Sequence, residues 1–176
     1  MAQAGGKLET IVDRKHLSLM RRGTWEYVSR KGVCGIVGIV AVTDDRKLVL
    51  VEQYRPPVDA NVIELPAGLA GDLPGQSTEP LENAARRELL EETGYEAAEM
   101  RRVADGTASA GITDEVISLF VATGLKKTGE GAGDGSEQII VHEVPLEAVE
   151  NWLAQQRKSG KLVDLKVYGG LHFAKA

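Results

Sequence analysis

The sequence predicts an α/β fold, in which apolar strands and amphipathic helices share one chain. Residues 33–43 form a continuous apolar run, which is typical of a strand buried on both faces. Residues 79–93 have helical periodicity and are followed by Gly94, a common helix stop. Further apolar strands and a second periodic helix follow. At 176 residues, the chain has the usual length of a single domain.

Residues 1–30 are expected to form a small antiparallel β-region within the same folding unit as the main domain, residues 31–176. Short alternating segments at residues 8–12, 16–20 and 24–30 indicate three strands.

The next elements indicate a core hairpin and a short third strand. Residues 33–43 and 47–54 are apolar strands that are separated by a polar turn. Residues 62–69 read as one short strand ending in a Pro-Ala-Gly corner, and residues 70–78 as a loop.

The helix over residues 79–93 has the clearest boundaries. Pro80 suits the first helical position, with Thr78 or Glu79 as the cap. Gly94 supplies the C-terminal stop.

The rest of the chain predicts further strands and helices, in which apolar runs indicate strands and helical spacing of apolar residues indicates helices. The predicted elements are strands at 97–103, 116–122 and 138–143, a glycine-rich loop at 124–137, and helices at 146–156 and 162–173.

Charge and composition exclude some functions. The hydrophobic fraction is 43% and the charged fraction 27%, which are ordinary globular proportions. A net charge of -5 argues against a nucleic-acid partner, although a small phosphate ligand can still bind through metal ions. The single cysteine, Cys34, lies in the apolar run and is expected to be a small buried hydrophobe. We expect no membrane association and a cytoplasmic protein, because neither a spanning segment nor a signal peptide is apparent.

Three glutamates of the predicted helix point to a metal site. At spacings of three and four residues, Glu88, Glu91 and Glu92 project from one helix face and repel one another. Such a cluster favours a divalent cation with oxygen preference, Mg2+ or Mn2+. The alternative is a solvated acidic face on which Arg87 pairs with Glu91.

These residues belong to a longer pattern that resembles the Nudix box. That box reads Gly, five residues, Glu, seven residues, then Arg-Glu-apolar-x-Glu-Glu-x-Gly-apolar. Here Glu79 is followed after seven residues by Arg87, and the later positions match through Tyr95. Leu73 stands where the leading glycine belongs, so we expect Gly68 to take that role across a loop five residues longer than usual.

The resemblance runs from about Trp25 to Leu153 and is greatest to the ADP-ribose pyrophosphatase branch of the family. It rests on residues 51–57, 63–68, 111–115 and 144–146. It implies an α/β/α Nudix sandwich around a mixed sheet, with the N-terminal β-region helping to form a homodimer. The implied reaction is metal-dependent hydrolysis of ADP-ribose to AMP and ribose 5-phosphate, with two or three Mg2+ ions for which Mn2+ can substitute. The alternatives are a broader nucleoside diphosphate sugar hydrolase, acting on ADP-glucose, GDP-mannose or similar compounds, and a non-catalytic nucleotide sensor.

The resemblance also implies roles for individual residues. Glu88 and Glu92 would be the principal metal ligands, completed by the backbone carbonyl of Ala67 and by Glu91, which otherwise orients water. Arg87 would hold these glutamates in place. The residues expected to support the site are Glu79, Gly68 and Gly94.

The general base is expected in the glycine-rich loop. Glu137 is the first choice, because it precedes the apolar strand at 138–143 as the family's loop glutamate does. Glu130 and Asp134 are alternatives, as is a merely solvated acidic loop.

Other residues are expected to bind the substrate. Arg55 would contact a phosphate, and Glu64 and Glu115 would hydrogen-bond ribose hydroxyls or hold Arg55 by a salt bridge. Trp25 would either stack on the base, with a dimer partner closing the pocket, or serve as a core or interface residue.

Overall fold

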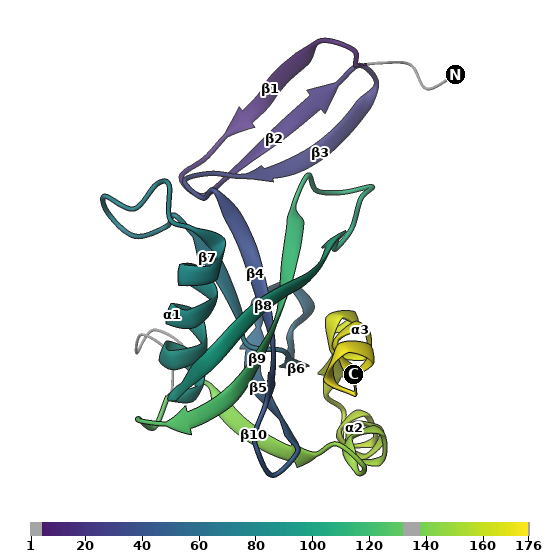
Figure 1. Ribbon diagram of the computed structural model, residues 1–176. Helices are drawn as coiled ribbons and strands as arrows, with labels where there is room; N and C mark the ends of the chain where they lie inside the picture. The colour runs from purple at the N-terminus through teal and green to yellow at the C-terminus, as the bar shows by residue number, and fades with distance from the viewer. Residues whose placement is uncertain (1–4, 132–137, 176) are drawn as a thin grey trace.

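The protein has a mixed α/β architecture, seen here in a computed structural model that describes residues 5–131 and 138–175. A three-stranded antiparallel sheet precedes an eight-stranded mixed sheet, and three α-helices pack on the larger sheet. Figure 1 shows the small sheet projecting from one end of the molecule. The predicted fold class, including the N-terminal antiparallel β-region, is confirmed.

The N-terminal sheet consists of β1 (Leu8–Asp13), β2 (Leu17–Arg22) and β3 (Trp25–Arg30), in that order. It is attached to the rest of the fold through β3. The backbone N–H of Val28 donates to the carbonyl of Ile112 at 2.7 Å, and the Ser29 hydroxyl donates to Asp114 at 2.8 Å. These contacts hold one edge of the small sheet against the segment that precedes β9.

Strand β4 (Gly35–Val42) lies at the centre of the larger sheet. It runs parallel to β9 (Val116–Lys127) and antiparallel to β7 (Ala67–Ala70). Its pairing with β5 (Lys47–Arg55) is restricted to two residue pairs beside the turn. The predicted hairpin is therefore present only near its turn, and the two strands diverge beyond it.

The remaining strands extend the sheet on both sides of this centre. The strand order is β11-β6-β5-β4-β9-β8, with β10 paired to β5 and β7 paired to β4. The bounds are β6 (Ala60–Glu64), β8 (Tyr95–Thr107), β10 (Ile140–Pro145) and β11 (Leu162–Val163), and a short 3-10 helix, η1 (Pro56–Val58), joins β5 to β6.

The single strand predicted over residues 62–69 was wrong, because this segment forms β6 and β7 with a break at Leu65 and Pro66. Proline has no N–H to donate to a sheet ladder. Its carbonyl accepts instead from the backbone N–H of Ile39 at 2.8 Å. The chain changes partner at this point, from β5 to β4.

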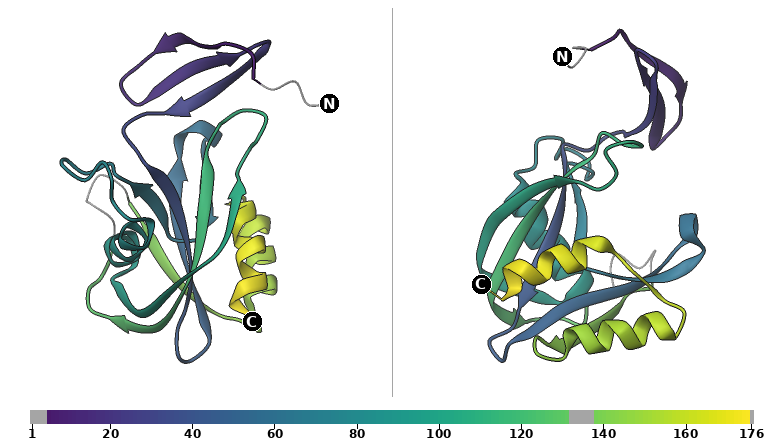
Figure 2. Two further views of the ribbon diagram at one scale, coloured as in Figure 1. Left: turned by 45° about the horizontal axis from the view of Figure 1, so that its top comes forward. Right: turned by 90° about the vertical axis from the view of Figure 1, so that its right-hand side faces the viewer.

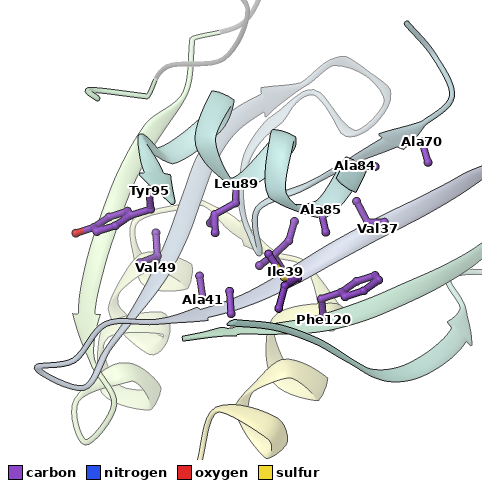
Figure 3. Close-up of a cluster of buried hydrophobic side chains, with 12 residues drawn as sticks. Val37, Ile39, Ala41, Val49, Ala70, Ala84, Ala85, Leu89, Tyr95 and Phe120 are labelled. Atoms are coloured by element: carbon purple, nitrogen blue, oxygen red, sulfur yellow. The ribbon is translucent and has the colours of Figure 1, made fainter. Parts of the chain in front are cut away.

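Helices cover both faces of the larger sheet. Helix α1 (Leu81–Thr93) packs on one face, and α2 (Val149–Lys158) and α3 (Leu165–Ala174) pack on the other (Figure 2). Each side has its own apolar cluster. The cluster under α1, drawn in Figure 3, joins Ala85 and Leu89 to sheet residues such as Ile39. The other cluster joins Leu153 and Leu171 to the opposite face.

The two ends of α1 differ in how well the sequence predicted them. The N-cap is Pro80, with no side-chain capping bond, so the predicted cap at Thr78 or Glu79 was wrong. The Glu79 carboxylate accepts instead from Arg87 and from the backbone N–H of Gly71. Gly94 closes the C-terminus in the left-handed region at φ 73°, as predicted, and its N–H donates to the Leu90 carbonyl at 2.8 Å.

The C-terminal third follows the prediction with shifted boundaries. Strand β9 continues to Lys127, into the segment predicted as a glycine-rich loop. The helix predicted over residues 162–173 begins only at Leu165, because the two residues before Asp164 form β11.

Cys34 is exposed, so the expectation of a buried thiol was wrong. It lies just before β4, and full burial of the apolar run begins only at Val37. None of the helices in residues 5–131 and 138–175 is long and apolar enough to cross a membrane.

Replacing Gly94 by alanine should lower the free energy of unfolding by about 2 kcal/mol or more, because φ is positive there. A Cβ would also lie 2.1 Å from the Gly129 carbonyl oxygen. Thermal unfolding followed by circular dichroism measures the change. Gly75→Ala is the matched control, since its φ is 80° but nothing lies within 4 Å of the added Cβ. Equal losses in the two variants would contradict the contact with Gly129.

Candidate active site

A cavity of about 550 Å³ lies where α1 and β7 meet the central strands. Its described lining carries more negative than positive side chains. The carboxylates are Glu64, Asp72, Glu88, Glu91, Glu92 and Glu115, and the cations are Arg30, Arg55, Arg87 and Lys166. A second hollow, of about 570 Å³, is formed by α2 and α3 and contains none of the predicted site residues.

The site is built on a close approach of α1 to β7. The backbone N–H of Ala67 donates to Glu92 at 3.0 Å, and that of Leu69 donates to Glu88 at 3.2 Å. Between them, Gly68 faces the Glu88 carboxylate so closely that an added Cβ would lie 1.9 Å from its carbon. Only glycine allows this approach, which gives Gly68 a steric role in the site.

Arg87 is the electrostatic centre of the α1 end. Its Nη1 donates to Glu88 at 2.8 Å and to Glu91 at 3.1 Å, while its Nε and Nη2 donate to Glu79 at 3.2 and 3.1 Å. Nη2 also donates to the Leu69 carbonyl. One guanidinium thus joins α1 to Glu79, two residues before the helix begins, and to β7. The Glu79 pairing holds the pKa of that carboxyl below its ordinary value.

Glu88 and Glu92 are buried carboxylates with raised pKa values. Burial is the main cause in both, since it removes water from the charged form. It raises the pKa of Glu88 to about 7, against the opposing effect of Arg87. It raises the pKa of Glu92 to about 8, against the hydrogen bond from the Ala67 backbone. Neighbouring carboxylates add to both shifts, so the negative charge at this end is not fully compensated by the protein.

The chemistry of this donor set fits Mg2+ or Mn2+, because buried carboxylate oxygens lacking full compensation are typical ligands of these ions. In the described part of the chain, however, no three His, Cys, Asp or Glu side chains are grouped as ligands of one ion. Glu88 and Glu91 share the Nη1 of Arg87 instead. A metal ion at these glutamates would therefore compete with Arg87 for their oxygens.

The predicted substrate-binding residues divide into two ion pairs on the cavity wall. Arg55 donates to Glu64 through Nε at 2.6 Å and Nη2 at 3.0 Å, so Glu64 holds Arg55. Glu115 does not hold Arg55. It accepts instead from Arg30 at 2.7 Å.

Other predicted residues lie outside the cavity lining. Trp25 is 61% exposed, and its indole N–H donates to the Gly111 carbonyl at 3.1 Å. Glu130 is exposed and does not line the cavity. Glu137 and Asp134 lie outside the described residues, so the choice of a general base stays a prediction.

The structure adds residues that the sequence reasoning missed. Asp72 lines the cavity and accepts from Arg87 at 3.3 Å, and its only sequence signal is its place in the lengthened loop. Arg30, the last residue of β3, also lines the cavity, but in the sequence it looks like an ordinary polar residue of a strand. Lys166 enters through α3, far along the chain from the other lining residues, and no sequence pattern marks it.

Comparisons with known proteins identify several relatives of this chain. The "Methanol dehydrogenase activator" of Bacillus methanolicus is 37% identical over 124 residues, covering 70% of this chain and 64% of that protein. The "ADP-ribose pyrophosphatase" of Bacillus subtilis (strain 168) is 37% identical over 114 residues, covering 64% and 59%. The "GDP-mannose pyrophosphatase" of Klebsiella pneumoniae is 34% identical over 130 residues, covering 69% and 63%. The chain thus spans about three-fifths of the length of these relatives.

A solved structure described as "Crystal structure of ADP compounds hydrolase" has the same fold, with a TM-score of 0.64 at 20% identity over 84% of this chain and 82% of that one. The NUDIX domain family matches residues 35–164, a segment that includes the whole of α1 and β7. Because that match covers well over half of the chain, the protein belongs to the Nudix family.

Proposed function

We propose that this protein hydrolyses the diphosphate bond of ADP-ribose, giving AMP and ribose 5-phosphate, with two or three bound Mg2+ ions that Mn2+ can replace. The observation that carries the proposal is the cavity itself. The buried glutamates of α1 line it together with Arg55 and Lys166. Carboxylates that hold metal ions and cations that hold phosphate are the two requirements of phosphoryl chemistry. The relatives named as pyrophosphatases support the same reaction class.

The α1 end would hold the metal. Glu88 and Glu92 are the principal ligands in this proposal, with Glu91 and the backbone carbonyl of Ala67 completing the set. Bound Mg2+ supplies charge neutralisation on the diphosphate and lowers the pKa of the attacking water. Arg87 is a positioning residue, because its guanidinium fixes Glu88, Glu91 and Glu79 rather than reaching across the cavity.

Arg55 and Glu115, which line the same cavity, would bind the nucleotide. Arg55, oriented by its two bonds to Glu64, donates to a phosphate oxygen. Glu115 lines the cavity beside Arg30 and accepts from a ribose hydroxyl. Both roles need groups whose directions are fixed before the substrate arrives, and the ion pairs provide that fixing.

Glu137 remains our proposal for the general base. It is two residues from Ile139 in the sequence, and Ile139 lines the cavity. Glu130 is a weaker choice because it is exposed and outside the lining.

A homodimer formed through the N-terminal sheet is also part of the proposal. Of the described residues in β1, β2 and β3, only Ser18 is buried, and a three-stranded sheet without a packed face is marginally stable. Its exposed large apolar side chains are Leu8, Ile11, Val12, Leu17 and Trp25. By the strand register, Leu8 and Trp25 lie on one face of the sheet, and Val12 and Leu17 lie on the other. A second copy that covers the first face would remove Leu8 and Trp25 from water, and it would bring Trp25 toward a partner's nucleobase.

Incubation with ADP-ribose and Mg2+ should yield AMP and ribose 5-phosphate in equal amounts, as measured by chromatography. Glu92→Gln should lower kcat by about 100-fold or more, because the amide removes a charged metal ligand. The matched control is Glu82→Gln on the same helix, since Glu82 is exposed and pairs only with Arg86 in the described structure. Its rate should equal that of the parent.

Two outcomes of this experiment would change the proposal. If ADP-glucose or GDP-mannose is cleaved far faster than ADP-ribose, the protein is a broader nucleoside diphosphate sugar hydrolase. If the parent and Glu92→Gln give equal rates, the metal mechanism is wrong, and if both rates are zero the protein is a non-catalytic nucleotide sensor.

Without metal, the free energy of unfolding should fall as pH rises from about 4.5 to about 8. Glu88 and Glu92 have pKa values of about 7 and 8 in the fold, against 4.5 as the ordinary value. The folded state therefore binds more protons than the unfolded state in this window, with a slope of up to about 1.4 kcal/mol per pH unit for each group. Thermal unfolding in a chelator at several pH values measures this slope.

Added Mg2+ should reverse this trend, because it binds the deprotonated carboxylates. The rise in Tm on adding Mg2+ should therefore be larger at pH 8 than at pH 6. Glu92→Gln, which has no proton to lose at this position, should show a shallower slope without metal. A slope unchanged by that substitution would contradict the assignment to Glu92.

Light scattering should give a mass near twice the 18.9 kDa of one chain. Leu8→Glu combined with Trp25→Glu should reduce it to a single chain, because two charges would enter the proposed interface. Leu162→Glu is the control, since Leu162 is also an exposed leucine but lies in β11. A single-chain mass for the parent would refute the dimer.

A further inference from the structure

We propose that Lys166 is a substrate-binding residue, which contacts the anionic diphosphate of a nucleoside diphosphate in the cavity that α1 also lines. This inference rests on the proposed function and names a residue of the same site. Lys166 lines the cavity, although it lies far from the other lining residues in sequence. It belongs to the first turn of α3, which packs on the other face of the sheet from α1.

A short parallel strand pairing brings Lys166 to the cavity. Strand β11 pairs with β6 through Leu162 and Val62 and through Val163 and Ile63. The N–H of Asp164 then donates to the Ile63 carbonyl at 2.9 Å. The start of α3 is thereby fixed next to the end of β6, where Glu64 holds Arg55.

Asp164 also fixes the side chain of Lys166. Its carboxylate caps α3 by accepting from the backbone N–H of Lys166 at 2.7 Å, and it forms an ion pair with the ammonium group of the same residue. The Lys166 side chain is 24% exposed, so it is held but not enclosed. An ammonium group has three N–H donors, and the pair with Asp164 leaves donors for a second anion.

Charge balance separates Lys166 from the other cations of the cavity. Arg55, Arg30 and Arg87 each pair with carboxylates that themselves line the cavity. The partner of Lys166, Asp164, is not among the described lining residues. Lys166 therefore adds a cation to the described lining without adding a carboxylate, which favours an incoming anion.

The position of Lys166 relative to the glutamates assigns it to the diphosphate. Arg55 and Glu64 line the same cavity as Glu88 and Glu92 of the metal-binding end. Lys166 enters beside Glu64 from the far side of β6. A diphosphate in this cavity would lie between the α1 glutamates and the two cations Arg55 and Lys166. Metal ions held by the glutamates would neutralise part of its charge, and Arg55 and Lys166 would donate hydrogen bonds to its oxygens.

The test uses Lys166→Met, Lys166→Arg and the control Lys175→Met. Lys175 is the C-cap residue of the same helix and pairs with Glu150 at the surface. Affinity is measured by calorimetry with the α,β-methylene analogue of ADP-ribose in Mg2+, which cannot be hydrolysed at that bond. Lys166→Met should bind about 10-fold more weakly, since a charged hydrogen bond is lost. In ADP-ribose turnover its KM should rise by about the same factor, with kcat within about twofold.

The two other variants decide between binding and folding. Lys166→Arg keeps the charge and should bind within about threefold of the parent, and it also serves if Lys166→Met fails to fold. Lys175→Met should match the parent. Equal affinity and KM for Lys166→Met and the parent would overturn the proposal, and so would an equal loss in Lys175→Met, which would assign the effect to the stability of α3.

The measurements also separate this inference from the proposed function. If the parent binds the analogue but does not hydrolyse ADP-ribose, the proposed reaction is wrong. The comparison of affinities between the parent and Lys166→Met would still test whether Lys166 binds the diphosphate. A parent that does not bind the analogue would overturn both.

Discussion

The candidate site depends on the close approach of α1 to β7 at Gly68. No side chain can stand between the helix and the strand there, because the Glu88 carboxylate already fills the space of a Cβ. The backbone N–H groups on either side of Gly68 bind the glutamates of two successive turns. Since β7 is paired with β4, the central strand, the glutamates are fixed to the most buried part of the sheet. A small shift of this helix would uncouple the site from the fold.

Arg87 makes this arrangement possible at a tolerable electrostatic cost. Several carboxylates at one helix face would repel one another, and burial makes each charge more costly. A guanidinium can satisfy several acceptors at once because its donors form a rigid fork. Arg87 uses this fork to link Glu79, Glu88 and Glu91 with the Leu69 carbonyl. The raised pKa values of Glu88 and Glu92 indicate that its charge is not sufficient, and a metal ion would supply the remainder.

The sequence predicted local features well and long-range placement poorly. Helix α1, its end at Gly94 and its glutamate face follow from spacing alone, since helical geometry is periodic. The break at Pro66 was missed because a change of pairing partner leaves no mark on periodicity. Lys166 reaches the cavity through a two-residue strand, which is too short for any sequence pattern. The exposed position of Trp25 likewise depends on how the N-terminal sheet attaches to the rest of the fold.

The distribution of charge in the cavity links these observations. The described lining has six carboxylates and four cations, so a diphosphate alone would meet net repulsion. The cations are not spread evenly, because Arg87 is engaged by the helix glutamates while Arg55 and Lys166 stand beside β6. In the proposed mode of binding, added cations would neutralise the α1 end and the protein's own cations would meet the other end of the diphosphate. Affinity for substrate and affinity for metal are then two parts of one electrostatic balance, and each should strengthen the other.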